Sequence, residues 1–117
     1  MSTTYSGGCQ CGGVRYEVSA EIGEVMSCNC SRCMKLGWLL TFVPASDFRL
    51  KAGDDAVSDF QFNKHNIHHL FCKTCGIESF ARGKGPGGAE MVAINVRCLD
   101  GVDPDTFKVK KIDGRSL

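Results

Sequence analysis

Seven of the eight cysteines are grouped in three short motifs whose spacing suits a metal ion. The motifs are "CQC" at residues 9–11, "CNCSRC" at residues 28–33 and "CKTC" at residues 72–75, and Cys98 stands alone. In an extended backbone, residues i and i+2 face the same way, so a C-x-C motif can present both sulfurs to one ion. In C-x-x-C the chain must turn between the ligands. Gly76 after the last motif tolerates the left-handed backbone that such a turn often needs.

Two of these pairs together supply the four sulfurs of a closed zinc site. All-thiolate zinc sites are tetrahedral, with Zn–S distances of about 2.3 Å. The sequence predicts one structural zinc with four ligands, namely Cys9, Cys11, Cys72 and Cys75. Such a zinc would tie the N-terminal segment to the second half of the chain and contribute to the free energy of folding. The alternative, that one pair is a buried or redox-active thiol pair, is disfavoured because two matched pairs are present.

The remaining cluster, Cys28, Cys30 and Cys33, is one ligand short of a closed site. If Cys98 folds back onto this cluster, the second site has four thiolates and is closed. If it does not, the second zinc has three thiolates and an open position for water or a substrate thiol. Residues 90–99 are expected to form a strand with Cys98 on its apolar face. The simpler interpretation of Cys98 is therefore a small buried residue.

Other polar residues near the motifs are weaker candidates for chemistry. His65, His68 or His69 could complete the second site or act as an acid or base, but a surface or supporting role is favoured for each. His68 and His69 are expected on opposite faces of a strand. Four cations are candidates to bind substrate carboxylates, although solvated charge is favoured for any single one: Arg32, Lys35, Arg82 and Arg97. Trp38 could line a cleft, but it is expected to be part of the core.

Short strands separated by glycine and proline must position these motifs. Strands are expected at residues 13–20, 38–43, 48–53, 59–63, 68–72, 76–83 and 90–99, and in a tail segment at 107–112. One helix is expected at residues 31–36, with Ser31 as its N-cap and Gly37 as its stop. "GKGPGG" is expected to connect two strands. It is not interpreted as a dinucleotide-binding turn because no helix follows it. The pattern predicts an all-β fold, a small zinc-stapled β-sandwich or half-open barrel with one short helical turn.

Composition limits the class of protein further. A length of 117 residues predicts one domain over residues 1–117, and a net charge of +1 offers no basic surface for nucleic acid. No stretch approaches the roughly 18 apolar residues of a membrane span, and the N-terminus lacks secretory features. We expect a cytoplasmic protein, in which cysteines this dense bind metal rather than form disulfides. No oligomeric state follows from these patterns.

The order of the motifs resembles a known family. C-x-C, C-x-C-S-x-C, F-C-x-x-C-G and the late "INVRCLDG" resemble the glutathione-dependent formaldehyde-activating (GFA) enzymes and their relative centromere protein V, over residues 6–101. The resemblance implies a structural zinc on the first and last motifs. It implies a labile, catalytic zinc on Cys28, Cys30 and Cys33, with the fourth position open for substrate. The characterised enzymes are longer, and this chain carries little beyond the shared core.

The leading hypothesis combines these inferences. By its resemblance, the chain is a zinc-dependent carbon–sulfur lyase that condenses a small thiol such as glutathione with an aldehyde such as formaldehyde. The alternative is a protein-binding module without activity, in which both zincs are structural. A third possibility is redox sensing, in which oxidation of the three-cysteine cluster releases zinc.

Overall fold

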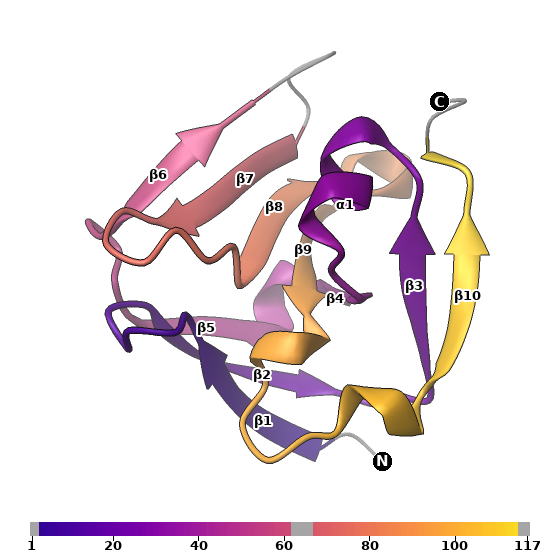
Figure 1. The fold of residues 1–117 in the computed structure, drawn as a ribbon, viewed down its shortest axis with the longest axis horizontal. Helices are drawn as coiled ribbons and strands as arrows, with labels where there is room; N and C mark the ends of the chain where they lie inside the picture. The colour runs from indigo at the N-terminus through magenta and orange to yellow at the C-terminus, as the bar shows by residue number, and fades with distance from the viewer. Residues whose placement is uncertain (1–2, 62–66, 115–117) are drawn as a thin grey trace.

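The structure, a computed structural model, describes residues 3–61 and 67–114. In these ranges the chain forms two β-sheets and one short α-helix, α1 (Ser31–Leu36), as Figure 1 shows. The strands are β1 (Thr3–Gly8), β2 (Arg15–Ala20), β3 (Glu24–Cys28), β4 (Leu40–Pro44), β5 (Phe48–Ala52), β6 (Val57–Phe60), β7 (Ile67–Cys72), β8 (Phe80–Lys84), β9 (Glu90–Asn95) and β10 (Lys108–Ile112). Single 3-10 turns lie at Ala45–Asp47, Pro86–Gly88, Val96–Cys98 and Pro104–Thr106. The prediction of a mainly β fold with one short helix is confirmed.

The two sheets differ in size and in strand direction. The smaller has the order β1-β2-β5 and is antiparallel throughout. The larger has the order β10-β3-β4-β9-β8-β7-β6 and is antiparallel except where β10 runs parallel to β3. Parallel pairing needs a long connection, and here it brings the end of the chain beside the first half of the sequence. The C-terminal strand therefore ends beside Cys28, the last residue of β3.

The main core lies between the two sheets. Alternation along β2 and the residue before it buries Val14, Tyr16 and Val18 as predicted, each at 1% exposure or less. The Tyr16 ring packs against Phe48 of the small sheet at 5.1 Å and against Phe80 of the large sheet at 5.8 Å between centroids. The Tyr16 hydroxyl donates a hydrogen bond to the carbonyl of Ser79 at 3.0 Å. One side chain therefore joins both sheets by packing and by a buried polar contact.

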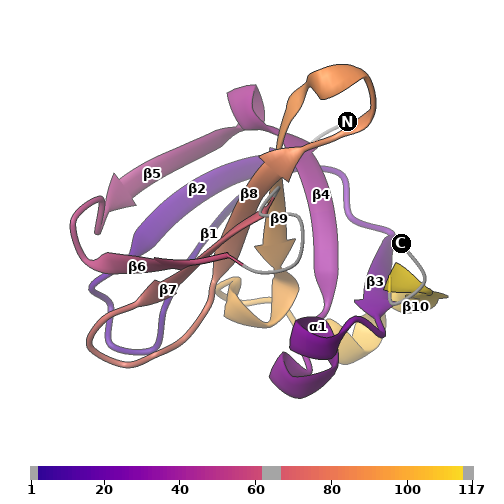
Figure 2. The same cartoon turned by 90° about the horizontal axis from the view of Figure 1, so that it is seen from above.

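A second, smaller apolar cluster lies on the outer face of the large sheet. His69, Ala81 and Ala93 are neighbours across β7, β8 and β9, so their side chains share one face. The two small alanines leave room for Trp38, which packs there. Helix α1 lies on this side, away from β2 and β5 in both views (Figures 1 and 2).

Helix α1 has the predicted bounds but not the predicted N-cap. Gly37 ends it with a left-handed backbone, φ 69°, as expected. The N-cap is Cys30, whose sulfur accepts the backbone N–H of Cys33 at 3.3 Å, so the prediction of Ser31 is wrong. The reason is local: Cys30 has the extended backbone of a capping residue, while Ser31 already lies inside the first turn.

Several strand bounds also differ from the predictions. The strand expected at 38–43 begins at Leu40, and the strand expected at 90–99 ends at Asn95. The second strand stops because the Asn95 side chain accepts the N–H of Arg97 at 3.1 Å and turns the chain into a 3-10 segment. Cys98 is therefore not on a strand face.

The remaining predicted segments differ by smaller amounts. The segment expected at 59–63 becomes strand β6, which ends at Phe60, while residues 62–66 lie outside the described residues. "GKGPGG" connects β8 to β9, as predicted. No helix in the described part of the chain is long and apolar enough to cross a membrane.

Replacing Tyr16 with phenylalanine tests the buried link between the sheets. Tyr16→Phe keeps the ring but leaves the Ser79 carbonyl without its hydroxyl donor. We expect a loss of about 0.5–1.5 kcal/mol in the free energy of unfolding, because one buried hydrogen bond is lost while the Ser79 carbonyl still accepts the N–H of Asn95. Urea denaturation of the metal-loaded protein measures it. Tyr5→Phe, at a partly buried tyrosine packed on the same core, is the control and should cost less.

Candidate metal centres

The first candidate centre joins the small sheet to the large one. Cys9 and Cys11 follow β1, while Cys72 ends β7 and Cys75 follows it. The four sulfurs lie within 4.8 Å of one another, and two of the separations, Cys9–Cys11 and Cys11–Cys72, are 3.6 Å. Tetrahedral zinc with bonds of about 2.3 Å would place its sulfurs about 3.8 Å apart, so this donor set fits zinc.

Backbone N–H groups favour the thiolate form of Cys72 and Cys75. The N–H groups of Val14 and Thr74 point at the sulfurs of Cys9 and Cys72, at 3.2 and 3.4 Å. A hydrogen bond from the N–H of Ile77 lowers the pKa of Cys75 to about 6, and hydrogen bonds from Cys75 and Thr74 lower the pKa of Cys72. Thiolates are the form that binds metal, so the turn after β7 is built to hold a cation.

That turn depends on Gly76. Its φ of 79° is left-handed, as the sequence predicts, and its N–H donates to the carbonyl of Cys72 at 2.9 Å. The N–H of Cys72 in turn donates to the carbonyl of Ile77 at 3.0 Å. These two hydrogen bonds close the turn from Cys72 to Ile77, called the knuckle below. They also set the direction in which the chain continues toward β8.

The second candidate centre lies at the start of α1. Cys28 is the last residue of β3, Cys30 caps the helix and Cys33 lies in its first turn, with all three sulfurs within 4.8 Å of one another. Burial acts to raise the pKa of Cys30, yet the backbone N–H of Cys33 and the Cys33 and Cys28 thiols lower it overall. Burial raises the pKa of Cys33. Metal binding at Cys33 therefore requires a cation strong enough to displace a proton from a buried thiol.

No fourth ligand joins this group within the ranges 3–61 and 67–114. Cys98 is half-buried, and burial, together with the charges of Cys9 and Cys75, raises its pKa to about 11. Those neighbours place Cys98 nearer the first centre than the second. His65 lies outside the described residues.

An apolar wall flanks the second centre. Trp38 is 4% exposed and packs with Cys33, Leu40 and Ala81, so the prediction that it belongs to a core is confirmed. Its Nε1–H makes no hydrogen bond of good geometry with the protein, but its approach to the Cys33 sulfur acts to lower the pKa of that thiol. The indole therefore offers a donor beside a sulfur.

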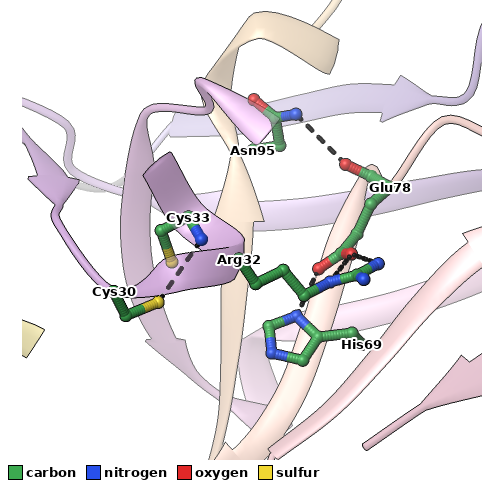
Figure 3. A network of polar contacts seen from close by, with 6 residues as sticks. All are labelled: Cys30, Arg32, Cys33, His69, Glu78 and Asn95. Carbon is green, nitrogen blue, oxygen red and sulfur yellow. Dashed lines mark hydrogen bonds and ion pairs between the residues drawn. The ribbon is translucent and has the colours of Figure 1, made fainter. Parts of the chain in front are cut away.

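Beside this wall, Arg32, His69 and Glu78 form a network of polar contacts, which Figure 3 shows, with Glu78 and His69 buried. Glu78 accepts from Arg32 of α1 at 2.6 Å and lies 2.7 Å from the Nδ1 atom of His69 on β7. Sequence reasoning missed Glu78, because a lone glutamate after a C-x-x-C-G motif carries no spacing signal. For His69 it weighed a ligand or an acid–base group and favoured a surface or supporting role, without predicting its contact with Glu78.

The other predicted candidates are placed as follows. His68 lies on the opposite face to His69, as predicted, and bonds Asp59 at 2.7 Å. Arg82 is stacked on the ring of Phe48 at 5.0 Å, on the inner face of the sheet and away from α1. Lys35 and Arg97 are exposed.

The C-terminal segment also touches the second centre, which the sequence did not predict. The N–H of Asn29 donates to the carbonyl of Ile112 at 3.2 Å, and its side chain donates to Asp113 at 2.9 Å. A Cβ atom on Gly114 would collide with the sulfur of Cys28. The contact follows from the parallel pairing of β10 with β3, which no local pattern indicates.

Comparison with known proteins agrees with this geometry. A sequence model of the family described as glutathione-dependent formaldehyde-activating enzyme matches residues 4–111. This chain belongs to the glutathione-dependent formaldehyde-activating enzyme family. The GFA resemblance inferred from the cysteine motifs is therefore confirmed. The fold is also similar to the crystal structure of a Rhodobacter sphaeroides protein, with a TM-score of 0.80 and 32% identity, over 92% of this chain and 99% of that one.

The raised pKa of Cys98 predicts a slow thiol. With a pKa of about 11, only about one thiol in a thousand is ionised at pH 8. We expect alkylation of Cys98 by iodoacetamide to quicken about tenfold per pH unit from pH 8 to pH 10, because the thiolate is the nucleophile. Peptide mass spectrometry of pulse-labelled native protein measures this. The urea-unfolded chain is the control, and equal rates in the two states would contradict the prediction.

Gly114→Ala tests the contact of the C-terminal segment with Cys28. The added methyl meets the sulfur, so the segment must move and the bond from Asn29 to Ile112 should weaken. We expect faster hydrogen exchange at the Asn29 amide, measured by NMR. We also expect weaker cobalt binding at the three-cysteine centre, measured by absorption.

Gly23→Ala is the matched control, since nothing lies within 4 Å of a Cβ there. Unchanged Asn29 exchange in Gly114→Ala would show that the segment does not hold this contact in solution.

Proposed function

We propose that this GFA-family chain is a zinc-dependent enzyme that joins a small thiol to an aldehyde, with glutathione and formaldehyde as the substrates that the family name suggests. The observation that carries the proposal is the contrast between the two centres. One group has four cysteine sulfurs, and the other has three with no fourth ligand in the described part of the chain. Closed zinc sites are structural, while catalytic sites keep a position for substrate.

The two groups of cysteines take different roles in this proposal. Cys9, Cys11, Cys72 and Cys75 hold a structural zinc, and Cys28, Cys30 and Cys33 hold a labile, catalytic one. When bound there, zinc supplies positive charge that stabilises a substrate thiolate and can polarise an aldehyde oxygen. Thiolate ligands select zinc over harder cations such as magnesium.

The reaction is an addition that needs no oxidant. The sulfur of the thiol forms a bond to the aldehyde carbon, the carbon–oxygen double bond becomes single, and the proton of the thiol ends on that oxygen. The protein side contributes an apolar wall, in which Trp38 and Leu40 are buried at 4% and 3% exposure. That wall excludes water from one side of the three sulfurs and strengthens electrostatic interactions there.

Recognition of the thiol substrate requires a cation near the second centre. Arg32 is held by the buried carboxylate of Glu78, so it is not available to a substrate carboxylate. Lys35 lies on the same helix, two residues after Cys33, and is exposed. We assign Lys35, rather than Arg32, as the helix cation that meets a substrate carboxylate.

The cysteines support one proposal about the cellular setting. All eight are unpaired, which suits a reducing compartment. We propose that the chain works in the cytoplasm and that residues 1–117 act as one domain.

Replacing Cys30 with serine tests the division of roles. Cys30→Ser removes one of three thiolates from the second centre and leaves the first intact. We expect a folded protein with one bound zinc. When the reaction of glutathione with ¹³C-formaldehyde is followed by NMR, this variant should show no turnover. In cobalt-loaded wild type, one of the two thiolate-to-metal absorption signals should shift saturably as glutathione is added, and Cys30→Ser should lose that signal.

Cys98→Ser is the control, because Cys98 lies outside both sulfur groups, and it should keep two metals and wild-type turnover. Loss of folding in Cys30→Ser would contradict the separation of structural from catalytic zinc. Two bound zincs without turnover on any thiol and aldehyde would instead favour a protein-binding module.

A further inference from the structure

We propose that Glu78 is a positioning residue for the three-cysteine centre, which it links to the four-cysteine centre. Through Arg32 it holds the turn that carries Cys30 and Cys33, and through its own backbone it is fixed by the turn that carries Cys72 and Cys75. The inference rests on one element of the proposed function, that the three cysteines bind a metal.

Glu78 is held at both oxygens in a fully buried position. Its side chain is 0% exposed, and Oε1 accepts the Nη2–H and Nε–H of Arg32 at 2.6 and 3.0 Å. Oε2 lies 2.7 Å from Nδ1 of His69, which is itself 3% exposed. A carboxylate that is buried this completely is stable only with such partners, so its geometry is closely specified. Figure 3 shows the carboxylate between the guanidinium and the imidazole.

Arg32 transmits this geometry to the metal ligands. It lies in α1 between Cys30, which caps the helix, and Cys33, which is buried. A helix of six residues is not stable by itself, so tertiary contacts must set its orientation. The guanidinium also lies over the ring of Phe60 at 4.7 Å. The pair with Glu78 therefore anchors the short element that carries two of the three sulfurs.

The position of Glu78 is set in turn by the first centre. Glu78 is three residues after Cys75, beyond the left-handed Gly76 that closes the knuckle. The N–H of Cys72 bonds the carbonyl of Ile77, and the side chain of Asn95 bonds the carbonyl of Glu78 at 3.1 Å. A metal that orders the knuckle therefore also orders the carboxylate. In this proposal, metal binding at the four-cysteine centre fixes the position of Glu78. Glu78 in turn fixes Arg32 and the helix that carries the ligands of the three-cysteine centre.

The second oxygen of Glu78 acts on the wall of the same site. It holds the His69 ring, whose centroid is 6.0 Å from that of Trp38. Trp38 in turn packs with Cys33. One carboxylate thus supports both the helix and the apolar wall around the three sulfurs.

Metal release separates this role from a general loss of stability. Protein loaded with two zincs is mixed with a chromophoric chelator, and release of each zinc is followed by absorption. In Glu78→Gln we expect the labile zinc to leave about tenfold faster or more, as when outer partners of metal ligands are removed. The second, slowly released zinc should leave at the wild-type rate, which a globally destabilised protein would not show.

Further variants complete the design. Glu17→Gln is the matched control, since Glu17 pairs with Arg49 and Lys51 on the exposed side of the small sheet. Arg32→Gln removes the guanidinium that pairs with Glu78. The Arg32 side chain is 21% exposed, so this position tolerates substitution better than the buried Glu78. If both residues act through one contact, Arg32→Gln combined with Glu78→Gln should release zinc no faster than the more affected single variant.

The outcomes are distinguishable. If wild-type protein binds only one zinc, the three-cysteine metal site of the proposed function fails, and this inference fails with it. If wild type binds two and Glu78→Gln releases the labile zinc at the wild-type rate, this inference alone is overturned. Should Glu78→Gln not fold, Arg32→Gln decides: faster release of the labile zinc alone supports the link, and unchanged release refutes it.

Discussion

Mutual repulsion among four converging cysteine thiolates is the constraint on which the rest of the structure depends. Their sulfurs come from the segment after β1 and from the end of β7 and the turn after it, in two different sheets, and lie within 4.8 Å of one another. Like charges this close cannot all ionise unless a cation neutralises them. A thiophilic metal satisfies that requirement and at the same time joins the small sheet to the large one. Backbone N–H groups that already lower the pKa of Cys72 and Cys75 prepare the group for such an ion.

From that knuckle the chain leads directly to the second group of sulfurs. Gly76 turns the backbone, Glu78 enters the protein interior, and its carboxylate meets Arg32 of α1. The contact between Glu78 and Arg32 lies on the outer side of the large sheet. On the same side, Ala81 and Ala93 leave space for Trp38. The aromatic rings of Tyr16, Phe48 and Phe80 pack against the inner face of the same sheet. One sheet therefore carries a conventional core on one side and a cysteine-lined site on the other.

Local patterns predicted those parts of the fold that depend on neighbouring residues. Alternation along β2 and the helix between Ser31 and Leu36 could be predicted because each is governed by spacing of a few residues. The same reasoning failed at Asn95, where a side chain bonds the backbone and ends the strand. It failed also at the N-cap of α1, where a cysteine sulfur took the role that serine usually has. In both places a specific polar contact overrode a general propensity.

The amino-acid sequence by itself determined which residues can bind metal, because pairs of thiols two or three residues apart converge through local backbone geometry. It also indicated the family, since the order of the motifs is a property of the chain alone. Only the tertiary structure decided how the groups combine. It brought Cys9 beside Cys72, placed the buried Glu78 against Arg32, and set Gly114 against Cys28. Each of these contacts joins residues more than 40 positions apart, and Glu78 and Arg32 are 46 positions apart. Such pairings are selected by the packing of whole sheets rather than by any local pattern.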